Sequence, residues 1–169
     1  MRTVSAGPTP EQCKRLQCSF ENENSCGYKT VKSTFTFQVA KGRFYGPQAG
    51  IKRPAKGTYY LAAYMRGRGK AIIENSVDPT GSSSSFNFSY VEHINGIQLK
   101  GCCDNEDNCP FKTRQAAKVV DYRKYWQAGS LTCPKGTKRV LFVCHNMGFK
   151  TSRNMGSCGL DEIQISGCD

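Results

Sequence analysis

Hydrophobic and polar side chains alternate along several short segments of the chain. In 33–39, two phenylalanines and a valine fall on one face, and threonine and glutamine fall on the other. The same period of two recurs in 86–93, and the β-rich segment 57–64 follows a loop rich in glycine and proline. Because successive side chains of a strand point to opposite faces, each segment predicts a strand with one buried face.

Two more strands are expected in 139–144 and 160–165. The dipeptide Asn95-Gly96 separates the strand before it from 97–99, and it is typical of the turn in a tight hairpin. Only 113–126 has a pattern compatible with a helix. Many short strands between Gly/Pro turns predict an all-β fold, a β-sandwich or jelly roll.

The chain predicts one domain behind a short leader. Residues 1–12 are polar, contain two prolines and predict a flexible segment. No repeat or linker divides 13–169, so we expect a single β-sandwich domain there. The longest apolar runs, such as 140–144, have the length of a strand, which predicts no transmembrane segment. Residues 1–10 lack the apolar core of a signal peptide, so we expect a mature or trimmed segment.

The chain contains 10 cysteines in 169 residues, an even and high number. This usage predicts disulfides and an oxidising compartment, and therefore a secreted or cell-surface protein. Zinc is the alternative, but it requires cysteine pairs at spacings such as C-x-x-C, with a second pair or histidines. The cysteines do not have this spacing and the two histidines are isolated. We expect disulfides and no cofactor, except for the calcium considered below.

Positive charge is concentrated in one part of the chain. Lys and Arg number 24 against 13 Asp and Glu, a net charge of +11, and 27–73 contains ten basic residues and no acidic one. This excess is either a solvated surface or a patch that binds polyanions. In an extracellular setting, the polyanion would be a sulfated glycosaminoglycan or an anionic membrane. The candidate residues are Lys41, Arg43, Lys52, Arg53, Lys56, Arg66, Arg68 and Lys70.

Aromatic residues are interleaved with these cations in 44–64, and we expect their rings to lie in the core because the region predicts strands. The sharpest basic cluster, 66–70, predicts a loop tip. No element that stacks bases or enters a groove is evident, so nucleic acid is not an expected partner.

Three blocks of sequence occur in a recognisable order. They are CSFE (18–21) with CGY (26–28); GP (46–47) and GTYYL (57–61) with FNFSY (86–90) and GIQL (96–99); and CGLDEI (158–163) with Cys168. Together they resemble the MAM domain, an extracellular jelly-roll module of meprins, neuropilins and receptor tyrosine phosphatases. The resemblance spans 18–168 and implies an extracellular module that recognises other proteins.

The resemblance implies a disulfide between Cys18 and Cys26. The family's cysteine before its middle strand is absent here, where 82–85 is a serine run, so Cys168 needs another partner. The first and last strands of a jelly roll lie close together, which makes Cys13 a candidate.

Local disulfides are expected between Cys103 and Cys109 and between Cys144 and Cys158. Ten cysteines allow on the order of a thousand pairings, so the remaining connectivity stays open.

The resemblance also suggests a cation site at Glu21 and Asp161, with structural calcium. A second acidic cluster, 104–108, could offer oxygen ligands, but it lacks the spacing of an EF-hand. For that cluster we expect a solvated loop or one that faces a partner.

Catalysis has little support in the sequence. Cys144 and His145 are adjacent on a predicted strand, so their side chains point to opposite faces and form no nucleophile–base pair. His93 also falls in a strand pattern, and no G-x-S-x-G, H-E-x-x-H or phosphate loop occurs. We therefore expect no enzyme. One glycosylation sequon begins at Asn87, inside a predicted strand.

Three hypotheses of function follow. The first is a module for recognition or adhesion that binds an extracellular protein or receptor ectodomain. The second is a basic matrix protein that binds sulfated glycosaminoglycan or anionic membrane through 41–70. The third is an enzyme or toxin whose site the sequence does not show.

Overall fold

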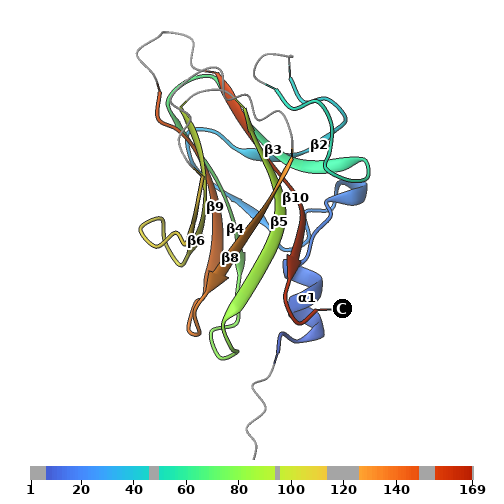
Figure 1. Ribbon diagram of the computed structural model, residues 1–169, viewed down its shortest axis with the longest axis vertical. Coiled ribbons are helices and arrows are strands. Elements are labelled where there is room, and N and C mark those ends of the chain that lie inside the picture. The colour runs from blue at the N-terminus through green and yellow to red at the C-terminus, as the bar shows by residue number, and fades with distance from the viewer. Residues whose placement is uncertain (1–6, 46–49, 94–95, 114–125, 149–154, 169) are drawn as a thin grey trace, which may run out of the picture.

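Two five-stranded antiparallel sheets face each other in the computed structural model (Figure 1). The structure describes residues 7–45, 50–93, 96–113, 126–148 and 155–168. The first sheet has the strand order β1-β4-β9-β6-β7, and the second has the order β2-β3-β10-β5-β8. The chain is thus an all-β sandwich of the jelly-roll type in one domain, as the alternating pattern predicted.

The strands of the first sheet are β1 (Lys29–Val31), β4 (Gly69–Ser76), β6 (Ile97–Cys103), β7 (Phe111–Lys112) and β9 (Arg139–Asn146). Those of the second sheet are β2 (Phe37–Lys41), β3 (Tyr59–Met65), β5 (Ser84–His93), β8 (Gln127–Cys133) and β10 (Gly156–Ile165). The pattern predicted β2, β3, β5, β6, β9 and β10, each with a shift at one or both ends. It missed β1, β4, β7 and β8, where short length or a mixed composition weakens the contrast between the two faces.

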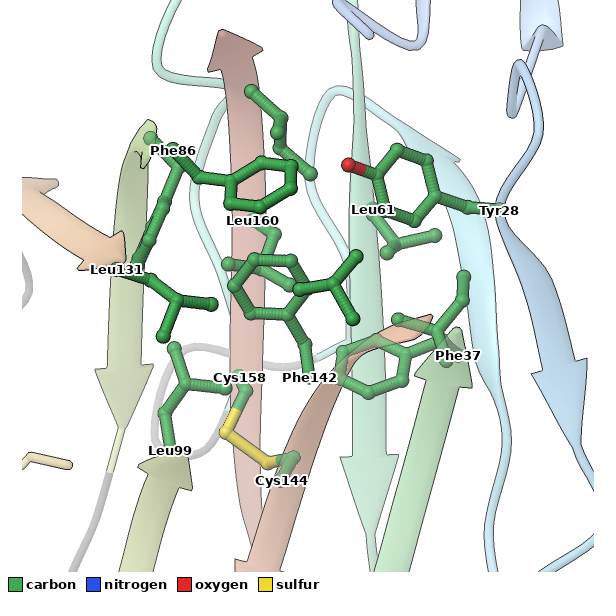
Figure 2. Close-up of a cluster of buried hydrophobic side chains, with 14 of the residues drawn as sticks. Tyr28, Phe37, Leu61, Phe86, Leu99, Leu131, Phe142, Cys144, Cys158 and Leu160 are labelled. Atoms are coloured by element: carbon green, nitrogen blue, oxygen red, sulfur yellow. A yellow bond between two sulfur atoms is a disulfide. The ribbon is translucent and has the colours of Figure 1, made fainter. Parts of the chain in front are cut away.

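The core lies between the sheets (Figure 2). Leu61 and Leu160 from the second sheet meet Leu99 and Phe142 from the first, and all four are at most 1% exposed. The Phe142 ring lies edge-on to Phe88 of β5, with 5.1 Å between the ring centroids. Side chains on alternate positions of facing strands therefore fill one continuous hydrophobic layer.

The expected hairpin between β5 and β6 is wrong. β5 pairs with β10 and β8 in the second sheet, whereas β6 pairs with β9 and β7 in the first. Phe86 of β5 and Leu99 of β6 belong to the same core cluster, so the two strands face each other across the core. Alternating apolar side chains are buried equally well when two strands pack against each other across the core, so the alternation did not show which strands pair. The chain passes from the second sheet to the first between β5 and β6.

A helix, α1 (Pro10–Leu16), precedes the first strand. A 3₁₀ turn, η1 (Glu21–Glu23), lies between this helix and β1. Thr9 caps α1 by accepting a hydrogen bond from the Gln12 N–H at 3.2 Å, and Leu16 is fully buried. Residues 10–12 are thus helical, inside the expected leader. The predicted helix at 113–126 lies almost wholly outside the described residues. The parts that the structure describes contain no helix long and apolar enough to cross a membrane.

All ten cysteines form disulfides, so none is left as a thiolate for zinc. Three expected pairings are present: Cys13 with Cys168, Cys18 with Cys26, and Cys144 with Cys158. The first of these ties α1 to the end of β10, and Figure 1 shows the helix beside the C-terminal end.

The expected disulfide between Cys103 and Cys109 is wrong. Cys102 pairs with Cys109, and Cys103 pairs with Cys133 on β8 of the opposite sheet. Neighbouring residues on a strand point to opposite faces, so Cys103 lies in the core while Cys102 lies on the outer face of the first sheet.

Candidate functional site

The chain between β2 and β3 folds back over the outer face of the second sheet. We call its described residues, 42–45 and 50–58, the covering segment. Phe44 and Ile51 pair through two backbone hydrogen bonds, with N–O distances of 2.8 and 2.9 Å. Their side chains pack on Tyr60, Ala62 and Val91 in a buried cluster separate from the main core. The covering segment is thus anchored by its own apolar side chains.

Asp161 of β10 also holds the covering segment. Its side chain is fully buried, and its Oδ2 accepts hydrogen bonds from the Ala55 and Lys56 N–H groups at 3.1 and 3.2 Å. Its Oδ1 accepts the N–H of Glu162, which lies at a β-bulge with φ of +51°. Burial raises the pKa of Asp161 to about 6, and the backbone hydrogen bonds from Lys56 and Glu162 oppose this rise.

The stability of the protein is expected to depend on the protonation of Asp161. Because the folded state raises the pKa of this carboxyl to about 6, folding favours the protonated form. Its contribution is full below pH 4 and declines as pH rises through 6, by up to about 3 kcal/mol. Urea unfolding of the wild type and Asp161→Asn from pH 4 to pH 7.5 measures it. Because the variant lacks this titration, its curve should be flatter; parallel curves would contradict the assignment.

Glu21 holds the residues that follow directly, at the C-terminal end of the covering segment. Its Oε1 accepts the Thr58 N–H at 2.8 Å, and its Oε2 accepts the Tyr59 N–H at 2.7 Å. Gly57 has a φ of +70°, and a Cβ there would lie 2.5 Å from Oε1. Glycine is required at this position for both reasons.

The carboxylates of Glu21 and Asp161 therefore have a different role from the calcium site that the resemblance implied. Their oxygens accept backbone N–H groups, whose positive ends would repel a cation. Among the described residues, no group of three or more His, Cys, Asp or Glu side chains is arranged to hold a metal ion. The two side chains instead fix successive parts of one basic segment.

The eight predicted polyanion-binding residues do not come together. Five of them, in 41–56, lie at the end of β2 and on the covering segment. Arg66 and Arg68 lie in the turn that joins β3 to β4. Lys70 lies on β4 of the first sheet, with its Nζ 2.9 Å from Glu106 Oε1. The predicted loop tip, 66–70, thus covers the turn after β3 and the start of β4, where the chain passes from the second sheet to the first.

All four cations of the covering segment are exposed: Arg43, Lys52, Arg53 and Lys56. Lys52, Arg53 and Lys56 make no ion pair within 4.0 Å in the part of the chain that the structure describes. The Arg53 carbonyl accepts a hydrogen bond from the Trp126 indole N–H at 2.8 Å. The backbone is held while the charges face solvent.

Tyr45 is the exception to the expectation that the aromatic rings of this region lie in the core. Phe44 and Tyr60 are buried, but Tyr45 is 54% exposed. Its ring stacks on Tyr64 of β3, with 4.0 Å between centroids and 11° between planes. The only sequence signal for this exposure is its position beside Gly46 in a cation-rich stretch.

The acidic cluster 104–108 has structural roles. Asp104 Oδ1 accepts the Lys138 N–H at 2.7 Å, and Asn105 Oδ1 accepts the Asp107 N–H at 2.9 Å. Glu106 forms the ion pair with Lys70. These contacts hold the loop closed by Cys102 and Cys109.

Two further sequence candidates can be placed. Asn87 is exposed on β5, the condition that its glycosylation requires, and modification there stays a prediction. Cys144 is bonded to Cys158 and has no thiol to act as a nucleophile. Burial and nearby Lys70 lower the pKa of His145.

The fold is similar to that of solved adhesin and carbohydrate-binding domains. The K1 cleaved adhesin domain of Lys-gingipain from Porphyromonas gingivalis has a TM-score of 0.60 and 16% identity, over 91% of this chain and 98% of that one. The carbohydrate-binding module TmCBM61, solved with β-1,4-galactotriose, has a TM-score of 0.50 and 15% identity, over 87% and 92%. At these identities the likeness shows the fold alone.

No family model and no curated protein matches the chain, so the resemblance to MAM domains stays a prediction.

Proposed function

We propose that the protein is an extracellular recognition module that binds a negatively charged partner through the covering segment, without catalysing a reaction. The observation that carries this proposal is the exposed group Lys52, Arg53 and Lys56, on a backbone fixed by Glu21 and Asp161. A fixed backbone reduces the entropy lost on binding, and unpaired cations attract a polyanion at long range.

Other features support an extracellular binding role. Five disulfides are typical of secreted proteins and cell-surface ectodomains. The solved domains of similar fold are an adhesin and a carbohydrate-binding module, both binding modules by name. The pairing of Cys144 with Cys158 removes the nucleophile that an enzyme could have used at that position.

The triple variant Lys52→Ala/Arg53→Ala/Lys56→Ala tests the proposal. Its affinity for immobilised heparin and for poly-L-glutamate, measured by biosensor at about 0.1 M salt, is expected to fall by at least about tenfold. The affinity of the wild type should also fall steeply with added salt, because screening weakens exposed charge pairs.

A matched control removes the same charge elsewhere. Lys112, Lys135 and Lys138 are exposed on other parts of the sandwich, so their replacement by alanine gives the same net charge. This control is expected to lose less than about threefold in affinity. Equal losses in the two triple variants would show that net charge, and not the covering segment, determines binding.

A further inference from the structure

Tyr45 is a large apolar side chain displayed to solvent beside the cations of the covering segment. At 54% exposure, it is the only exposed large hydrophobic residue among those that the structure describes. A lone exposed ring is common on protein surfaces, so exposure by itself decides nothing. The rings that pack on Tyr45 and the cations near it are stronger evidence of a binding role.

The Tyr45 ring is held rigidly. It stacks on Tyr64, and the Phe44 ring meets it at 90° with 4.6 Å between centroids. The Tyr64 hydroxyl in turn donates a hydrogen bond to the Met155 sulfur at 3.1 Å. The Tyr45 backbone has a φ of +62°, which is unfavourable for a side chain of this size. Unfavourable backbone geometry of this kind is concentrated at binding sites.

Two cations lie near Tyr45 in the covering segment, one on each strand of the Phe44–Ile51 bridge. Because Phe44 and Ile51 form an antiparallel bridge, Arg43 and Lys52 lie opposite each other, about 5 Å apart in such a pair. Tyr45 follows Arg43 by two residues. Arg43 and Lys52 are both exposed, so both sides of the bridge offer positive charge near Tyr45.

We propose that Tyr45, Arg43 and Lys52 form a subsite for one sugar ring of an anionic polysaccharide, sulfated or rich in uronate. The proposal rests on the proposed function and names its partner class. The C–H face of a pyranose is apolar and packs on an aromatic ring, while its sulfate or carboxylate groups pair with the guanidinium and ammonium groups.

Other polyanions fit this surface less well. An acidic polypeptide supplies carboxylates but no flat apolar ring for Tyr45. An anionic membrane binds surfaces that insert several apolar side chains, and the described residues expose one. Of these three extracellular polyanions, the polysaccharide is the one that uses the ring and the charges together.

The experiment measures the dissociation constant of a heparin-derived oligosaccharide by calorimetry at several salt concentrations. Tyr45→Ala is expected to weaken binding about tenfold, with no change in the slope of log Kd against log salt, because tyrosine carries no charge. Tyr45→Phe keeps the ring and should remain within about twofold of the wild type. Thermal unfolding should be nearly unchanged in both variants.

Poly-L-glutamate and phosphatidylserine vesicles provide the comparison. Their binding is expected to be insensitive to Tyr45→Ala. Unchanged oligosaccharide affinity in Tyr45→Ala would overturn the subsite, and so would an equal loss toward poly-L-glutamate or vesicles. If the triple variant of the covering segment still loses binding in those cases, the proposed function stands and only the sugar subsite fails.

Discussion

Replacing Cys144 and Cys158 together by alanine is expected to lower the free energy of unfolding by about 3–5 kcal/mol. This disulfide joins β9 of the first sheet to β10 of the second, and both cysteines are fully buried (Figure 2). Closing a loop of this length restricts the unfolded chain by about 3 kcal/mol, and the missing sulfur atoms leave a cavity that adds to the loss. Urea unfolding at constant pH measures the difference.

The disulfide between Cys18 and Cys26 is the matched comparison. It closes a shorter loop, with a separation of 8 residues against 14, and Cys26 is exposed. Its removal is expected to cost about 2–3 kcal/mol, mainly through the unfolded state, because only Cys18 of this pair is buried. If this pair cost as much as the buried one, the Cys144 and Cys158 sulfurs would contribute no more through packing than Cys18 does.

Gly57→Ala is expected to cost about 2–4 kcal/mol and to weaken polyanion binding. The left-handed backbone at φ of +70° disfavours a Cβ, and the added atom would displace the Glu21 carboxylate. That displacement breaks the hydrogen bonds to Thr58 and Tyr59, which position the end of the covering segment. Urea unfolding and heparin affinity measure the two effects.

Gly42→Ala separates backbone strain from the loss of Glu21. Gly42 has a similar φ of +63°, but nothing lies within 4 Å of a Cβ built there. This control is expected to cost about 1–2 kcal/mol from strain alone, with binding almost unchanged. Equal costs at the two glycines would mean that Glu21 does not hold the segment.

The sequence predicted strands from patterns of neighbouring residues. β2 and β5 were found because apolar residues fall on alternate positions, and β9 was found because 140–144 is a continuous apolar run. Both patterns are local properties. Pairing between strands is not local. β5 and β6 were expected to form a hairpin, yet each is satisfied by partners far away in the sequence.

For the cysteines, too, the sequence predicted a local property, the presence of disulfides, but not all of the pairing partners. An even number without zinc spacing was sufficient to predict disulfides. Choosing between Cys102 and Cys103 required knowing which face of β6 meets the core, because adjacent side chains on a strand diverge. The same uncertainty over faces affected the candidate site, where the sequence marked the cations but placed Tyr45 in the core.

By itself, the sequence determined the all-β class, the oxidised cysteines and the concentration of positive charge, because these depend on composition and on the alternation of neighbouring residues. Only the tertiary structure decided which cations share a surface, which backbone groups the Glu21 and Asp161 carboxylates bind, and where Tyr45 points. Each of these depends on groups that are distant in the sequence: Asp161 meets Lys56 across 105 positions. Local patterns carry no record of such contacts, which arise only when the two sheets pack and the covering segment folds over one of them.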